Sequence, residues 1–122
     1  MTAKPVTVSE TTAFRRSATA VLGADEIEAL VDFVARHPTA GVVIEGTGGI
    51  RKLRWQRPGM GKRGAARVIY YYHDDTLPLL LLLAYAKGEA DDLTADQRRR
   101  MAALVADLME QRTPLRLREI AI

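Results

Sequence analysis

The chain has 122 residues, of which 48% are hydrophobic and 27% are charged, and its formal net charge is +3. This length fits one domain, residues 1–122, with a single hydrophobic core, and the composition is that of a globular protein. The absence of cysteine excludes disulfides and thiolate metal sites. Together with an N-terminus that lacks an apolar signal-peptide core, it predicts a cytoplasmic protein. The longest apolar stretch, residues 77–86, is far shorter than the roughly 20 residues of a membrane helix, so no membrane partner is expected.

The N-terminal part of the chain predicts a short strand followed by two helices. Residues 6–9 are typical of a strand, and residues 12–22 of a helix that Gly23 stops. Residues 25–36 predict a stronger helix, which ends before Pro38 because the residue before a proline avoids helical geometry. The apolar side chains of this helix recur with helical spacing at Ile27, Leu30, Val31 and Val34.

The central part of the chain predicts an antiparallel sheet. Residues 42–44 form a brief extended piece, and strands are expected at residues 50–56, 66–73 and 79–86. These segments are rich in β-branched, aromatic or leucine residues and are separated by turn residues. The third strand is a nearly continuous leucine run, which is typical of a strand buried on both faces inside a sheet. The three strands are therefore expected to form a meander.

The C-terminal part predicts one more helix. Thr94 and Gln97 have the spacing of a capping box, and an apolar stripe follows them. Residues 115–122 are compatible with either a strand or a frayed helix. Together the elements predict an α+β domain in which the N-terminal helices pack on one face of the antiparallel sheet, a C-terminal helix follows, and the other face stays open. The expected stripe of the last helix consists of Met101, Leu104, Val105 and Leu108.

Positive charge is concentrated in residues 51–67, which include seven basic residues and no acidic one. Since the whole chain carries only +3, this charge gathers on two neighbouring strands and the turn between them, with aromatic residues among them. Such a surface attracts polyanions, and RNA or DNA is the first candidate. The basic residues are Arg51, Lys52, Arg54, Arg57, Lys62, Arg63 and Arg67.

Strand alternation sorts these charges, because successive side chains of a strand point to opposite sides of the sheet. In the first strand of the meander, Leu53 and Trp55 share the face expected to be core, while Lys52 and Arg54 share the other. The same alternation in the next two strands gives a consistent open face. Its expected members are Lys52, Arg54, Arg67, Tyr71, Tyr85 and Lys87.

Several motifs occur in the order found in one known family. They are Gly48-Gly-Ile-Arg-Lys-Leu-Arg-Trp55, the Gly61-Lys-Arg-Gly64 turn, Ala66-Arg-Val-Ile-Tyr-Tyr71, and Tyr85-Ala-Lys-Gly-Glu89 with Asp92-Leu-Thr94. In these residues the chain resembles the RelE/HigB superfamily of bacterial type II toxins, and within it the HigB-like branch. By order of elements, the resemblance extends over residues 24–110.

The resemblance implies a RelE-like domain that acts as a toxin endoribonuclease, an mRNA interferase, on mRNA. It also implies two macromolecular partners besides mRNA: the ribosome, at the A site of the 30S subunit, and a cognate helix-turn-helix antitoxin that blocks the toxin. The basic residues by themselves also allow an alternative function. That alternative is a non-catalytic nucleic-acid-binding or partner-binding module, such as a degenerate toxin or a DNA-binding regulator.

Metal-free RNA cleavage needs groups that take a proton from the ribose 2′-hydroxyl, protonate the leaving 5′ oxygen and stabilise charge on the phosphate. The sequence has no evident metal-ligand cluster, so no metal or cofactor is expected. Lys52 is the candidate base, because the cations beside it favour a neutral amine. Arg54 and Arg67 can bind phosphate oxygens through two hydrogen bonds each. The expected catalytic residues are Lys52, Arg54, Arg67 and, from the resemblance, Lys87; the expected substrate-binding residues are Arg51, Lys62, Arg63, Tyr71 and Tyr85.

Several of these residues also have a purely structural interpretation. The basic segment can be a solvated face. Trp55 is expected in the core rather than as a base-stacking platform, because it alternates with Leu53. His73 can shuttle protons near neutral pH, but its place beside Asp74 favours a turn histidine. Residues 98–100, three arginines early in the last helix, can contact RNA or an acidic partner, with a solvated helix face as the default.

Overall fold

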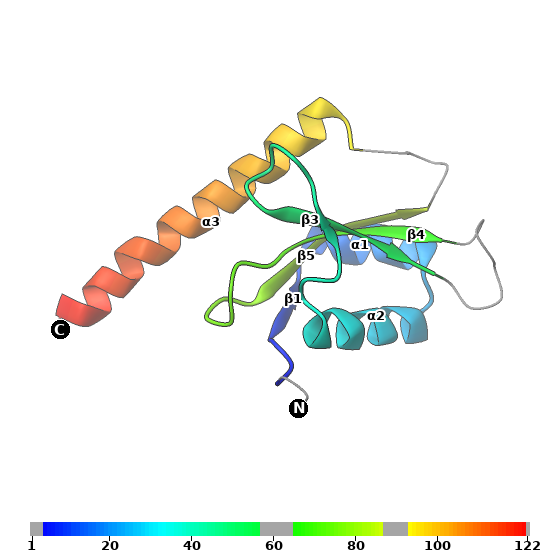
Figure 1. Ribbon diagram of the computed structural model, residues 1–122, viewed down its shortest axis with the longest axis horizontal. Coiled ribbons are helices and arrows are strands. Elements are labelled where there is room, and N and C mark those ends of the chain that lie inside the picture. The colour runs from blue at the N-terminus through cyan, green and yellow to red at the C-terminus, as the bar shows by residue number, and fades with distance from the viewer. Residues whose placement is uncertain (1–3, 57–64, 87–92, 122) are drawn as a thin grey trace.

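The structure, a computed structural model, describes residues 4–56, 65–86 and 93–121, with side chains described as far as Glu110. Its strands form one five-stranded sheet in the order β1-β5-β4-β3-β2 (Figure 1). The predicted α+β class is confirmed. The elements are β1 (Val8–Glu10), α1 (Thr12–Val21), α2 (Ala24–Arg36), β2 (Val42–Val43), β3 (Ile50–Trp55), β4 (Ala66–Tyr71), β5 (Leu79–Ala86) and α3 (Ala95–Ala121).

The predicted meander of β3, β4 and β5 is confirmed, and the sheet extends beyond it on both sides. β2 pairs with β3 antiparallel, whereas β1 pairs with β5 parallel, so the sheet is mixed rather than purely antiparallel. The long connection between β1 and β5, made of α1, α2 and the strands β2, β3 and β4, permits this parallel pairing.

Short side-chain caps set where the helices begin. The Thr11 hydroxyl accepts a hydrogen bond from the Phe14 N–H at 3.1 Å, which starts α1. The Glu26 carboxylate accepts from the Gly23 N–H at 3.2 Å at the start of α2. The predicted capping box of α3 is confirmed, because the Gln97 N–H donates to the Thr94 hydroxyl at 3.1 Å and the Thr94 N–H to the Gln97 side chain at 2.9 Å.

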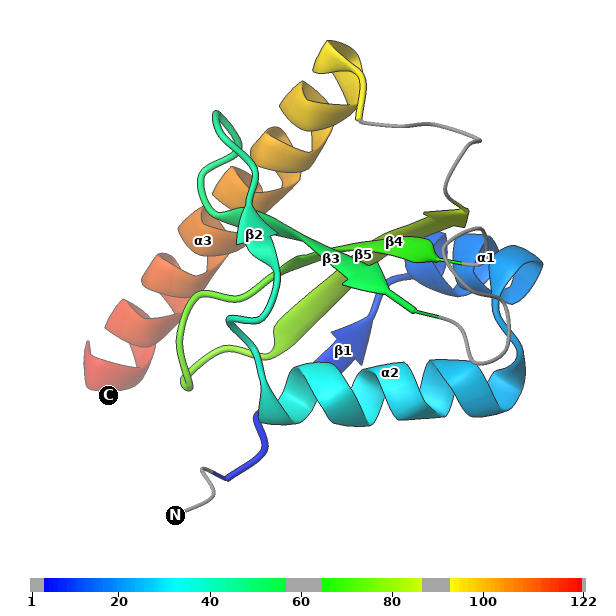
Figure 2. The ribbon, with the colours of Figure 1, turned by 45° about the vertical axis from the view of Figure 1, so that its right-hand side comes forward.

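Helices α1 and α2 cover one face of the sheet, which we call the helical face (Figure 2). Polar contacts fasten α1 to β5: the Thr11 hydroxyl donates to the Leu81 carbonyl at 2.8 Å, and the Ser17 hydroxyl accepts from the Ala84 N–H at 3.0 Å. The buried residues of this face are Phe14, Ala18, Leu22, Leu30, Val34, Leu53, Ala66, Val68, Tyr70, Leu79, Leu81 and Ala84.

The leucine run of β5 is buried on both faces, as predicted. Leu79 and Leu81 belong to the core under α1 and α2, while Leu82 and Tyr85 belong to a second cluster on the opposite face. β5 lies between β1 and β4, so both of its edges are paired as well. A strand in this position has no side exposed to water along most of its length, which explains its continuous apolar composition.

The opposite face was expected to stay open, and this expectation is wrong over part of the sheet, because α3 packs there. Leu93 and Val105 are buried against the strands, and Met101 and Met109 are partly buried beside them. Leu104, expected in the apolar stripe, is instead 42% exposed. The reason is that β4 and β5 present apolar side chains on this face too, and these must be covered. The strand residues under α3 are Ile50, Ile69, Tyr71, Leu82 and Tyr85.

Helix α3 continues to Ala121, so of the two conformations considered for the tail the structure has the helical one. Its C-terminal end extends past the body of the molecule (Figure 1). Among the residues that the structure describes, no helix is long and apolar enough to cross a membrane.

Candidate nucleic-acid interface

The pairing register of β3 and β4 brings three predicted site residues to one face. Arg54 lies opposite Arg67, and Lys52 lies opposite Ile69. Since side chains alternate along each strand, Lys52, Arg54 and Arg67 all project from the face opposite α1 and α2. The predicted alternation is therefore confirmed. Like charges directly opposite each other destabilise a strand pair, so this arrangement has an energetic cost.

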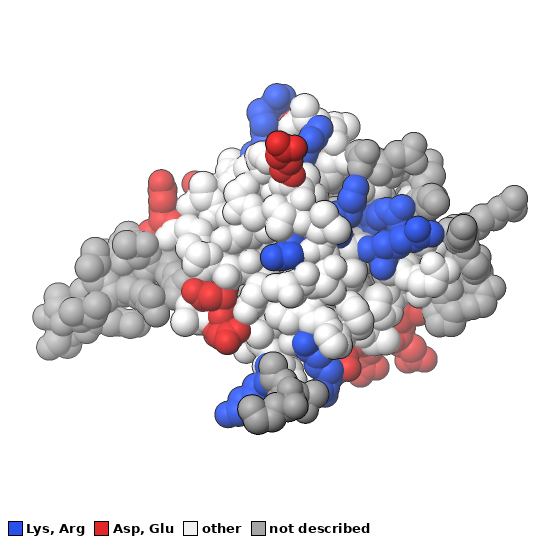
Figure 3. All heavy atoms as spheres, in the orientation of Figure 1, with Lys and Arg blue, Asp and Glu red and all other residues white. Residues whose placement is uncertain are grey.

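These three cations line a hollow of about 440 Å³, together with Ala40, Val42 and Leu53. β2 pairs with β3 at Arg51 and Lys52, and the Ile44 N–H donates to the Ile50 carbonyl at 2.8 Å. The β3 residues beyond Lys52, which include Arg54, are not paired with β2. Figure 3 shows basic side chains gathered over the right-hand part of the molecule, with smaller groups near the centre and near the start of α3. We call Lys52, Arg54 and Arg67 with their hollow the basic cluster.

The two arginines of the basic cluster have no acidic partner among the residues that the structure describes. Within residues 4–56, 65–86 and 93–110, no carboxylate forms an ion pair with Arg54 or Arg67. The Nη1 atom of Arg67 is buried and has no hydrogen-bond acceptor among these residues. A buried donor without an acceptor is costly, and a phosphate oxygen would satisfy it with a charge-assisted hydrogen bond. The cluster is therefore suited to an anion.

Arg51 was expected to bind substrate, but the structure places it away from the basic cluster. It projects toward the helical face, on the same side of β3 as Leu53. Its Nη1 atom donates to the carbonyl oxygens of Gly41 at 2.7 Å and Thr39 at 3.2 Å. Arg51 thus stabilises the segment between α2 and β2, which is a structural role.

The same segment is held by Tyr70, which is fully buried in the core. The Tyr70 hydroxyl donates to the Pro38 carbonyl at 2.9 Å and accepts from the Gly41 N–H at 2.8 Å. A Cβ atom at Gly41 would lie 2.8 Å from the Tyr70 ring, so only glycine fits here without a shift. Burial raises the pKa of Tyr70, an effect opposed by the Gly41 hydrogen bond and by the charge of Arg51.

Tyr71 and Tyr85 lie on the predicted face, but they are not open to solvent. They are only 6% and 8% exposed, because α3 packs over this part of the sheet. Burial, followed by the charge of Asp74, raises the pKa of Tyr71. The expectation that these two rings lie on an open face is therefore wrong, and their expected role in substrate binding stays a prediction. Tyr85 pairs across the strands with Arg67, and so lies beside the basic cluster.

Trp55 projects toward the helical face, as expected, and packs against the core there while remaining partly exposed. Its ring meets the ring of Phe33 in α2 edge-on, with centroids 5.8 Å apart. This contact assigns Trp55 a packing role.

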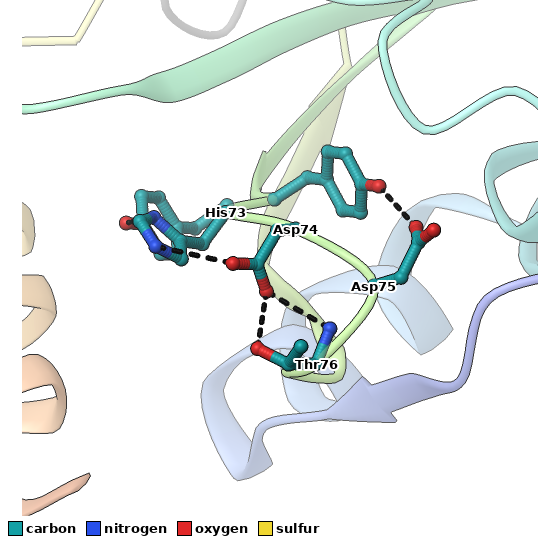
Figure 4. A network of polar contacts seen from close by, with 6 residues as sticks. His73, Asp74, Asp75 and Thr76 are labelled. Carbon is teal, nitrogen blue, oxygen red and sulfur yellow. Dashed lines mark hydrogen bonds and ion pairs between the residues drawn. The ribbon is translucent and has the colours of Figure 1, made fainter.

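His73 belongs to a network at the end of β4 that is remote from Arg67 along the strand (Figure 4). Its Nε2 atom lies 3.5 Å from the Asp74 carboxylate, and its Nδ1 atom lies 3.3 Å from the Tyr71 hydroxyl. Asp74 also accepts from the N–H of Thr76 at 2.9 Å and from its hydroxyl. These contacts fit the interpretation of His73 as a turn residue.

One basic residue joins the candidate site from a distant part of the sequence. Arg98, in the first turn of α3, lines a second hollow of about 190 Å³ with Ile44, Lys52 and Leu93. The default interpretation of residues 98–100 as a solvated face did not anticipate this hollow. No local pattern distinguishes Arg98 from Arg99 and Arg100, so only the packing of α3 could reveal it. Three further predicted site residues, Lys62, Arg63 and Lys87, lie outside the described residues.

No family model matches the chain. Among solved structures, the chain is similar to the toxin–antitoxin complex RelBE2 of Mycobacterium tuberculosis, with 22% identity, a TM-score of 0.47, and coverage of 67% of this chain and 98% of that one. It is also similar to a mutant of the E. coli toxin RelE in the free state, with 13% identity, a TM-score of 0.48, and coverage of 71% of this chain and 88% of that one. TM-scores below 0.5 do not assign a function to the chain.

Proposed function

We propose that the protein is a RelE/HigB-like toxin that cleaves mRNA as an endoribonuclease. The observation that carries the proposal is the basic cluster. Lys52, Arg54 and Arg67 surround one hollow, and the two arginines have no acidic partner in the described chain. Two of the motifs that resemble the family, residues 48–55 and 66–71, include the strands β3 and β4 that carry these residues.

In the proposed reaction, the ribose 2′-hydroxyl attacks the adjacent phosphorus atom. Lys52 accepts the proton of that hydroxyl, and Arg54 and Arg67 bind the phosphate oxygens and stabilise the charge that develops on them. The bond to the 5′ oxygen then breaks, and this oxygen leaves with a proton from a second group, for which the resemblance offers Lys87. The products are a 2′,3′-cyclic phosphate and a 5′-hydroxyl end.

The partners in the proposal follow from the resemblance rather than from the cluster. They are the ribosome, with mRNA in the A site of its 30S subunit, and a cognate helix-turn-helix antitoxin that suppresses the toxin. The cytoplasm, where translation takes place, is the corresponding compartment. A more specific form of the proposal assigns the protein to the HigB-like branch of the superfamily.

Expression in bacteria tests the proposal, with growth and mRNA cleavage followed after induction. Arg67→Ala should abolish toxicity while the fold stays intact, because removal of one donor to the developing oxyanion typically costs about 10²–10³ in rate. Arg15→Ala is the matched control, since Arg15 is an exposed arginine of α1, outside the basic cluster.

The outcome also decides between the toxin and a binding module. A folded Arg67→Ala variant that keeps full toxicity would remove Arg67 from the mechanism. If the wild-type protein binds RNA but yields no cyclic-phosphate ends, with and without ribosomes, the cations serve binding alone, and the non-catalytic module replaces the nuclease.

A further inference from the structure

Two hollows flank Lys52. The first is the hollow of the basic cluster, and the second lies between the β2–β3 region and the start of α3. Lys52 lines both, so the two hollows are neighbours that share one cation. A path across them runs from Arg67 and Arg54, past Lys52, to Arg98.

The three arginines in the first turns of α3 differ in their contacts. Arg99 and Arg100 both form ion pairs with the Asp96 carboxylate, at 3.7 Å and 3.0 Å. In the part of the chain that the structure describes, Arg98 has no ion pair, and it is the one of the three that lines the second hollow. Asp96 therefore offsets charge at Arg99 and Arg100, while the charge of Arg98 remains available at the hollow.

The remaining described walls of the second hollow are apolar. Leu93 is 6% exposed, and Ile44 packs partly buried against the same cluster. The hollow thus combines two cations with the apolar side chains of Ile44 and Leu93. This combination suits a nucleotide, whose phosphate is anionic and whose sugar and base have apolar faces. No carboxylate occurs among the described residues that line this hollow.

We infer that the second hollow is a binding subsite for a nucleotide adjacent to the cleaved bond, with Arg98 bound to that nucleotide's phosphate. Single-stranded RNA then lies across both hollows, with Lys52 between two successive phosphates. The inference rests on the proposed function, because it takes the first hollow as the place of the cleaved bond. It assigns Arg98 to substrate positioning and not to the reaction itself.

Binding of short RNA tests the inference on the full chain. The probes are 2′-O-methyl oligonucleotides, which lack the attacking hydroxyl and cannot be cleaved: a dinucleotide with one phosphate and a hexanucleotide with five. Fluorescence anisotropy measures the affinity of each for the wild type, Arg98→Gln and Arg99→Gln. The two variants change the same charge on the same helix, and both positions are exposed, so Arg99→Gln is the matched control.

We expect Arg98→Gln to weaken hexanucleotide binding about tenfold and to leave dinucleotide binding unchanged, since loss of one charge-assisted contact is of this size. The salt dependence of hexanucleotide binding should fall by about 0.7 in log–log slope, the value for one phosphate contact on a single strand. Arg99→Gln should behave like the wild type with both probes.

Two results would overturn the subsite. One is an equal loss in Arg98→Gln and Arg99→Gln, which would indicate a general charge effect of α3. The other is a wild type that binds the hexanucleotide no more tightly than the dinucleotide. Failure of the proposed function is a separate result: it shows as absence of RNA cleavage with natural RNA, whatever Arg98→Gln does to binding.

Discussion

The two faces of the sheet use the same strands for different purposes. On the helical face, α1 and α2 close over one continuous core that includes Phe14, Leu30 and Tyr70. On the opposite face, α3 covers a smaller cluster around Val105 and does not cover the hollow of the basic cluster. Because alternate residues of a strand serve opposite faces, stability and binding are encoded side by side in β3 and β4.

The largest expected effect is on the free energy of unfolding, and it allows the cores on the two faces of the sheet to be compared. Phe14→Ala removes a fully buried ring from the helical face and should lower the free energy of unfolding by about 3–5 kcal/mol. Val105→Ala removes two methyl groups under α3 and should cost only about 1–2 kcal/mol. Denaturant unfolding monitored by circular dichroism measures both. Equal losses would show that the α3 side contributes as much stability as the helical face.

A second prediction concerns the polar contacts inside the helical face. Tyr70→Phe keeps the ring but leaves the Gly41 N–H and the Pro38 carbonyl without their partner, which should cost about 1–3 kcal/mol of unfolding free energy. Tyr72→Phe is the control, because its hydroxyl bonds Asp75 at an exposed site and should matter by less than about 0.5 kcal/mol. A stable Tyr70→Phe variant would mean that the segment before β2 is held by other contacts.

A third prediction separates two arginines of the same strand. Arg54→Gln should reduce the salt slope of RNA binding by about 0.7, with little change in stability. Arg51→Gln should leave that slope unchanged and lower stability by about 1–2 kcal/mol, because its guanidinium bonds the carbonyls of Thr39 and Gly41. If both variants lower the slope equally, the division of β3 into a structural and a binding face is wrong.

The smallest expected effect is a dependence of stability on alkaline pH. Burial raises the pKa of Tyr70 above its ordinary value of 10.0, so in the folded protein this phenol stays protonated after an unfolded one has ionised. Unfolding therefore releases a proton from Tyr70 above about pH 10. The contribution of Tyr70 to stability is constant below that pH and falls above it. Tyr70→Phe should make the fall shallower without abolishing it, since the pKa values of Tyr71 and Tyr72 are raised as well. Unfolding midpoints measured between pH 8 and 11 would check this, and an identical fall in the variant would contradict it.

Local pattern placed most of the strands and helices but left residues 115–122 undecided between a strand and a helix, and it ordered the side chains along β3. Strand alternation correctly separated Lys52 and Arg54 from Leu53 and Trp55, because that period is a property of extended backbone alone. The same alternation also puts Arg51 on the helical face, yet Arg51 was expected among the substrate-binding cations because it adjoins them in the sequence. The number of charges along a segment does not show which face of the sheet each charge lies on, whereas the alternation of side chains along a strand does.

By itself, the sequence determined the α+β class, the meander, the capping box of the last helix and the concentration of positive charge on two strands. Each of these depends on residues close together in the chain. Tertiary structure alone decided which part of the second face α3 covers, and with it the burial of Tyr71 and Tyr85 and the arrival of Arg98 beside Lys52. These outcomes depend on how an apolar helix stripe meets an apolar patch of the sheet, and that match is made between segments far apart in the sequence, where local periodicity carries no information.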